Sequence, residues 1–200
     1  MRICCLPCSI RRKQAVQQPY ACYNENMNIT ELIKYRKSVR SWADKPVEID
    51  TVEKIIDVAR FAPSAKNLQD WRVIAITEPE LRVKMVKVAR GQEFVGEAPV
   101  IMAICGDSST GDMSCDMPRS VVDATILIDH ITLVAAGEGL GTCWIGSFDQ
   151  KACRELLQVP LGWEVVELLP LGYPANPSPV NKPRKKVSEV LNWNLWDGSL

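Results

Sequence analysis

The sequence lacks several features that would indicate a macromolecular partner or an export route. Its 24 Lys and Arg residues are balanced by 24 Asp and Glu residues, so no net charge attracts nucleic acid or an anionic membrane. No apolar run approaches the ~20 residues of a membrane span, and the first eight residues contain no apolar core of a secretory signal. We therefore expect a cytoplasmic protein without nucleic-acid or membrane partners, whose basic sites bind small anions.

Two nucleotide-binding motifs and nearly all histidine are also missing. There is no G-x-G-x-x-G stretch after a predicted strand and no G-x-x-x-x-G-K-[ST] stretch, so Rossmann and P-loop sites lose their main support. The single histidine, His130, lies within an apolar helical segment. We interpret it as a core or interface residue rather than an acid or base, and we assign no catalytic side chain.

Half of the eight cysteines crowd into the first 22 residues. Cys5 and Cys8 could begin a metal or iron–sulfur site, but no second pair and no histidine lie near them. We therefore expect no bound metal, and keep an electron-entry module as an alternative. Residues 1–27 show no sustained periodicity, which predicts a flexible Cys-rich leader, and residues 28–200 are expected to form one domain.

Helical and strand-like segments alternate after this leader. Asp50, with Glu53 three residues later, resembles an N-terminal capping box. Residues 119–138 are apolar on nearly every face, as in a helix buried on all sides. The interleaving favours a central sheet flanked by helices, in an α/β or α+β protein. We expect helices at 29–33, 50–62, 79–90, 119–138 and 150–158, and strands at 71–77, 99–105, 142–147 and 164–172.

Four polar stretches could carry chemistry, although each also has a plain structural explanation. Residues 36–40 (Arg-Lys-Ser-Val-Arg) suit a phosphate dianion, but also fit a solvated helix end. The hydroxyl and amides of residues 62–71 could read the edge of a planar heterocycle, or simply form a turn. The glycines of residues 139–146 allow close approach to a ligand, or cap a helix. Lys182 and Arg184 could complete a phosphate cage, or lie in a solvated tail.

Taken in order, these stretches resemble the nitroreductase family of FMN-dependent oxidoreductases, particularly its shorter members. The order is R-K-S-V-R, then P-S-A-x-N-x-Q-x-W, then G-L-G-T-C-W-I-G after a long apolar helix, and K-x-R near the end. The resemblance covers about residues 28–190. It implies an α+β fold, a three-layer α/β/α sandwich with a central, mostly antiparallel sheet. It also implies a homodimer formed through long helices, with two active sites at the interface.

The resemblance also assigns residues to FMN. The first and last stretches would hold the phosphate and ribityl chain, and the third would place backbone groups at the reactive edge of the ring. The second would lie against the flavin from the partner subunit. The corresponding residues are Arg36, Lys37, Ser38, Arg40, Lys182 and Arg184 for the phosphate and ribityl chain, Trp144, Ile145 and Gly146 for the ring edge, and Pro63, Ser64, Ala65 and Asn67 from the partner.

The implied activity is ping-pong transfer of electrons from NADH or NADPH, through FMN, to a small organic acceptor such as a nitroaromatic or a quinone. Two alternatives stay open: a non-catalytic flavin-binding protein, and a relative with other flavin chemistry, such as reductive dehalogenation. Cys143 is interpreted as a buried, small apolar residue rather than a nucleophile. One departure from the family pattern is Asp70, which adds a charge where many members have proline.

Overall fold

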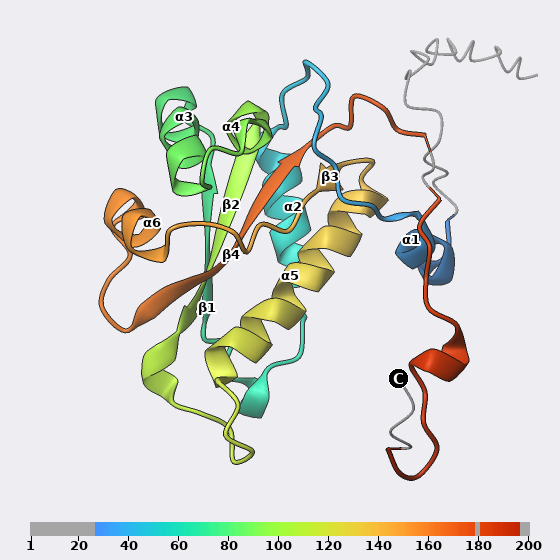
Figure 1. The fold of residues 1–200 in the computed structure, drawn as a ribbon. Helices are drawn as coiled ribbons and strands as arrows, with labels where there is room; N and C mark the ends of the chain where they lie inside the picture. Colours follow the sequence, from blue (N-terminus) through green and yellow to red (C-terminus); the bar gives the residue numbers. More distant parts are fainter. Residues whose placement is uncertain (1–26, 179–180, 197–200) are drawn as a thin grey trace, which may run out of the picture.

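A four-stranded antiparallel sheet forms the centre of the molecule, in a computed structural model that describes residues 27–178 and 181–196. The predicted leader, including Cys5 and Cys8, therefore lies outside the described residues, apart from Met27. The strands run in the order β1-β2-β4-β3 (Figure 1): β1 (Trp71–Ile76), β2 (Val100–Asp107), β4 (Trp163–Gly172) and β3 (Gly141–Thr142).

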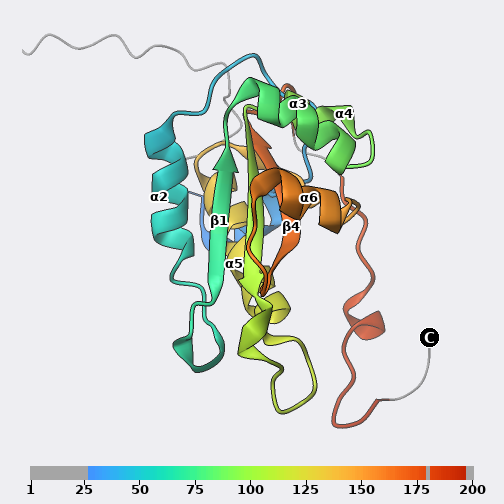
Figure 2. The same ribbon diagram turned by 90° about the vertical axis from the view of Figure 1, so that its left-hand side faces the viewer.

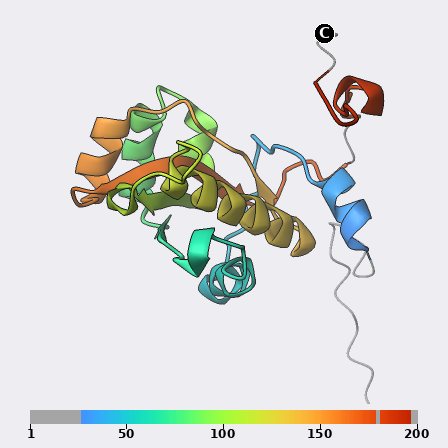
Figure 3. The same ribbon diagram turned by 90° about the horizontal axis from the view of Figure 1, so that it is seen from below.

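Helices cover both faces of this sheet (Figures 2 and 3). One face packs against α2 (Ile49–Ala59) and α5 (Arg119–Gly137), and the other packs against α3 (Pro79–Val88), α4 (Glu93–Glu97) and α6 (Gln150–Leu157). The apolar runs of β2 and β4 bury side chains on both faces, so each helical layer has its own core. The expected α+β sandwich with an antiparallel sheet is therefore confirmed.

Helix α5 is the longest helix among the described residues and spans the sheet diagonally (Figure 1). Within one chain it buries one face, and Val121 on another face stays 41% exposed. Length and composition alone would allow α5 to cross a membrane, but half of its apolar window is buried in the molecule, as in the core helix of a soluble protein. Within a single chain, α5 therefore lacks the burial on all sides that the sequence predicted.

The structure corrects the sequence prediction at the start of α2. The helix begins at Ile49 with Glu48 as N-cap, and no side chain caps it, so the capping box predicted at Asp50 and Glu53 is wrong. Asp50 instead lies in the first turn, where its charge complements the helix dipole. A true capping box occurs at α1 (Ile29–Tyr35), where Asn28 and Glu31 satisfy each other's backbone N–H groups.

Most other segments match their predicted ranges within a few residues, and the exceptions are short. Helix α4 has only five residues and was not predicted. The extended segment predicted at 142–147 forms strand pairs only at β3 and at Ile145, which bridges to Leu168. The remaining residues of that segment follow the edge of β4 without regular pairing.

Candidate functional site

The basic segment at residues 36–40 lies directly against β3. Ser38 pairs with Thr142 in a parallel bridge, and the Val39 N–H donates to the Thr142 carbonyl at 2.9 Å. Gly141 permits this approach, since a methyl group there would lie 2.4 Å from Val39 Cγ2. The fold therefore brings together the first and third predicted stretches, which lie far apart in the sequence.

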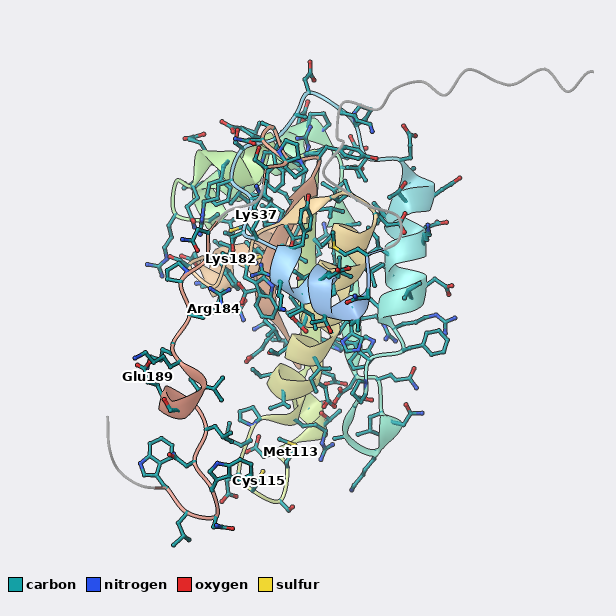
Figure 4. All side chains as sticks on the ribbon, turned by 90° about the vertical axis from the view of Figure 1, so that its right-hand side faces the viewer. Lys37, Met113, Cys115, Lys182, Arg184 and Glu189 are labelled. Carbon is teal, nitrogen blue, oxygen red and sulfur yellow. The ribbon has the colours of Figure 1, made fainter. Side chains whose placement is uncertain are left out.

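The C-terminal tail returns to the same place. The Lys182 ammonium donates to the carbonyl oxygens of Lys34 and Arg36, at the end of α1. The Lys37 ammonium donates to the carbonyls of Asn176 and Ser178, at 3.0 and 2.5 Å. Figure 4 shows Lys37, Lys182 and Arg184 on this side of the molecule. The predicted phosphate residues of the first and last stretches thus form one group.

This group, the basic cluster, consists of Arg36, Lys37, Lys182 and Arg184. The predicted Arg40 does not contribute to it, since its guanidinium lies over the Phe94 ring, 5.9 Å from the centroid. Burial lowers the pKa of Lys182, and the charges of Arg36, Arg184 and Lys37 lower it further. The salt bridges among the described residues are Lys54–Glu138, Arg60–Asp57 and Lys151–Glu155, so no carboxylate neutralises the cluster. Like charges held together without a counter-charge favour binding of an anion.

A hollow of about 440 Å³ lies beside the basic cluster, within the size range of ligand pockets. The phosphate of FMN carries about 1.5 to 2 negative charges and three acceptor oxygens. Guanidinium and ammonium groups are suitable donors for such oxygens. The donor set therefore fits FMN phosphate. The residues that line the hollow are Ile33, Lys34, Arg36, Asn181, Lys182 and Arg184.

Residues 144–146, the ring-edge segment, continue from β3 along β4. The Trp144 indole N–H donates to Thr132 Oγ1 on α5 at 3.1 Å, which ties this partly buried side chain to the helix. Ile145 is buried and pairs with Leu168, whereas Gly146 is exposed and carries no side chain. Backbone groups near Gly146 are therefore accessible to a ligand, as the sequence interpretation requires.

Cys143 precedes the ring-edge segment and is only 1% exposed. Burial raises the pKa of its thiol, against the opposing influence of the Arg40 charge and a hydrogen bond with Ser38. A thiol with a raised pKa is a poor nucleophile, which agrees with the interpretation of Cys143 as a small buried residue. His130 likewise has a structural contact, with Nδ1 3.0 Å from the Ile126 carbonyl oxygen.

The second predicted stretch does not join the basic cluster within one chain. Pro63, Ser64, Ala65 and Asn67 belong to the loop around η1 (Ala65–Asn67), beside the N-terminal end of α5 (Figure 1). The Ala65 N–H donates to Asp123 near that end, whereas Trp144 is held by Thr132, nine residues further on. Nine helical residues span roughly 14 Å. The helix therefore separates the two parts of the predicted site.

Two carboxylates that were not predicted as site residues lie near the predicted stretches, Asp123 on α5 and Glu167 on β4. Both are acidic residues within apolar segments, and a carboxylate kept from water needs a partner or a raised pKa. Burial raises the pKa of Asp123, and the charge of Asp70 raises it further, whereas the Ala65 N–H lowers it. Burial raises the pKa of Glu167 to about 7. The sequence feature that could have indicated them is an acidic residue among apolar neighbours.

Asp70, the departure from the family pattern, is buried. Its Oδ2 accepts a hydrogen bond from the Thr110 hydroxyl at 2.8 Å, and its carbonyl accepts one from the Asp107 N–H at 2.9 Å. The added carboxylate therefore ties the loop around η1 to the segment that follows β2. Asp70 and Asp123 support this loop together, because Asp123 accepts the Ala65 N–H from its other side.

Replacing Asp123 with alanine should lower the free energy of unfolding by about 1–3 kcal/mol, because the Ala65 N–H loses its partner. Asp123→Asn keeps an acceptor oxygen and removes the charge, so it should cost much less at pH 7. Since the folded-state pKa of Asp123 is raised, the folded protein binds the extra proton, and ionisation reduces stability as pH rises above about 3.9. Urea unfolding of both variants and wild type between pH 3.5 and 7 measures these differences. Equal stability of the alanine and asparagine variants would contradict this role.

The sequence and the fold are similar to those of known proteins over most of the chain. The nitroreductase family model matches residues 33–92 and 86–173. FMN reductase (NAD(P)H) of Bacillus subtilis strain 168 is 30% identical over 165 residues, covering 74% of this chain and 66% of that protein. A solved nitroreductase family protein of Clostridium difficile 630 is 32% identical, with a TM-score of 0.77 and coverage of 85% of this chain and 100% of that chain. The NADPH:FMN oxidoreductase of Vibrio harveyi, solved with NAD+, is 25% identical, with a TM-score of 0.80 and coverage of 87% and 80%.

Proposed function

The chain belongs to the nitroreductase family, and on that premise we propose that it is an FMN-dependent oxidoreductase that takes electrons from NADH or NADPH. The observation that carries the proposal is the unneutralised basic cluster beside an exposed, glycine-containing ring-edge segment. When bound, FMN supplies the group that accepts hydride and passes electrons to a small organic acceptor. The acceptor we propose is a nitroaromatic, a quinone or a similar molecule.

Each part of the site has its own task in this proposal. Arg36, Lys37, Lys182 and Arg184 bind the phosphate and the ribityl chain, together with the exposed Ser38 hydroxyl. The backbone of residues 144–146 orients the ring by lying along its reactive edge, and Trp144, anchored to α5, keeps that backbone in place. No side chain acts as a nucleophile, since the buried Cys143 thiol has a raised pKa.

We propose that a second copy of the chain completes each site. Its loop with Pro63, Ser64, Ala65 and Asn67 would reach the flavin of the first copy, because α5 separates the two parts within one chain. Apolar side chains on the tail support an interface: Trp193 is 80% and Trp196 is 78% exposed. The tail extends away from the body (Figure 3), so these apolar side chains are available for contact with another molecule.

The four described cysteines are free thiols. Free thiols fit a reducing compartment, so we place the enzyme in the cytoplasm.

Purified protein should show a flavin absorption spectrum, release FMN on denaturation, and elute as two chains in gel filtration with light scattering. It should oxidise NADH or NADPH in steady state only when a nitroaromatic or quinone acceptor is present, with ping-pong kinetics. A flavin-containing protein without turnover would support the binding-protein alternative. Colourless, monomeric protein that takes up no FMN at micromolar concentration would contradict the whole proposal.

A further inference from the structure

Glu167 is a charged residue in the middle of strand β4, between the exposed Glu164 near one end and the buried apolar residues of the other end. It pairs with Ile104 of β2, next to a register shift in the ladder. Its neighbour Leu168 exchanges two backbone hydrogen bonds with Ile145, with N–O distances of 3.0 and 3.3 Å. Glu167 is therefore held beside the ring-edge segment by the pairing of β4 with β2 on one side and with Ile145 on the other.

The carboxylate of Glu167 faces Gly146. A methyl group added at Gly146 would lie 3.6 and 3.7 Å from the two carboxylate oxygens, and no other described atom would come as near to it. Gly146 itself is exposed and leaves its backbone open. A ligand that rests on this backbone thus has the Glu167 carboxylate as its neighbour.

The Glu167 side chain has no hydrogen-bond or ion-pair partner among residues 27–178 and 181–196. Burial alone raises its pKa to about 7. The same carboxylate raises the pKa of Cys143, which Arg40 and Arg36 lower, so Glu167 and the basic cluster act on one neighbouring residue. No neighbouring charge in the described part of the chain contributes to the shift of the Glu167 pKa. The ionisable side chains on the adjoining elements are Cys143 before the ring-edge segment, Cys105 and Asp107 on β2, and Arg119, Asp123, Asp129 and His130 on α5.

We propose that the Glu167 carboxyl group sets the charge beside the ring of bound FMN and thereby influences how readily the flavin is reduced. This inference rests on the proposed function, because it needs FMN on the ring-edge segment. It assigns to β4 a task that none of the four predicted stretches contains.

The expected effect depends on the protonation of Glu167. Hydride transfer from NAD(P)H carries two electrons and one proton and leaves NAD(P)+, so the ring side of the site gains one negative charge. An ionised carboxylate in a poorly solvated position opposes that charge, whereas a neutral carboxyl group does not. Above a pH of about 7, wild-type Glu167 is ionised, and the midpoint potential of the bound flavin should therefore be lowered.

The test is a measurement of the two-electron midpoint potential of the bound FMN from pH 5.5 to 8.5, by dye-equilibrated reduction of the holoenzyme. Wild type and Glu167→Gln should agree at pH 5.5. At pH 8.5 the variant should be at least tenfold easier to reduce in its equilibrium constant, which is about 30 mV for two electrons. The matched control is Glu164→Gln, on the exposed part of the same strand, which should follow wild type at every pH.

A Glu167→Gln potential parallel to that of wild type over the whole pH range would overturn the inference. If glutamine disturbs the strand, two further variants serve as the test. Glu167→Asp keeps the charge and must retain the lowering of the midpoint potential above a pH of about 7, the pH-dependent step, whereas Glu167→Leu must lose it. Loss of the step in the aspartate variant, or its persistence in the leucine variant, would also overturn the inference. Failure of wild type to bind FMN would instead contradict the proposed function, so the two failures are distinguishable.

Discussion

Replacing Arg36 with alanine should weaken FMN binding roughly 10- to 100-fold while leaving the fold intact. The Arg36 guanidinium forms no hydrogen bond or ion pair among the described residues. Only its backbone is used, because its N–H donates to the Leu32 carbonyl and its carbonyl accepts from Lys182. The variant therefore removes little from the folded apoprotein. A charged hydrogen bond to phosphate contributes about 1.5–3 kcal/mol, and each 1.4 kcal/mol changes the dissociation constant tenfold.

Calorimetric titration of the apoprotein with FMN measures this dissociation constant, and urea unfolding of the apoprotein checks that stability stays within about 0.5 kcal/mol. Lys185→Ala is the matched control, because it removes one positive charge from the exposed tail beside Arg184. It should change binding little. Arg36→Lys keeps the charge but loses the planar fork, so its affinity should lie between those of wild type and alanine. Wild-type affinity in Arg36→Ala would show that the phosphate binds elsewhere.

The layers of the fold could be predicted because hydrophobic periodicity is a local property of the chain. The strands 71–77 and 164–172 and the helix 119–138 were each recognisable from their own residues. The start of α2 was not, since several acidic residues near Glu48 could serve as N-cap and tertiary packing chose among them. The sequence therefore predicts the order and type of the elements, but not their exact boundaries.

The site could be predicted only as separate pieces. The ordered motifs pointed to Arg36, Ser38 and Lys182, yet nothing local shows that Ser38 pairs with Thr142 or that Lys182 reaches the end of α1. Those contacts are products of the tertiary fold. The same holds for Glu167, which looks like any strand residue until the pairing of Ile145 with Leu168 places it beside Gly146.

The conformation of the loop around η1 could not be predicted from its own residues. Lys66, Asn67 and Gln69 all have left-handed backbone conformations, with φ between 53° and 55°. Such conformations are unfavourable for residues other than glycine, and they persist where surrounding contacts fix them. The buried Asp123 supplies such a contact from a helix far along the chain, so the turn residues alone could not predict this loop.

Gly141→Ala should destabilise the apoprotein by about 1–3 kcal/mol and also weaken FMN binding. The added methyl carbon would lie 2.4 Å from Val39 Cγ2 and 2.8 Å from Val39 Cβ, and both residues are buried. Because Val39 belongs to the basic segment and its N–H is bonded to Thr142, relief of the clash must move Arg36 and Arg40 away from β3. One methyl group thus tests whether close backbone approach positions the phosphate-binding residues.

Gly146→Ala is the matched control for stability, since its methyl group would make only ordinary contacts at 3.6 Å or more. Its urea unfolding should be close to that of wild type. Val39→Ala removes Cγ2, the nearest clashing atom, so the double variant should recover part of the stability lost in Gly141→Ala, a coupling of opposite sign to the single effects. If Gly141→Ala is as stable as wild type, or if Val39→Ala adds its own loss without any recovery, the contact between these two residues does not set the position of the basic segment.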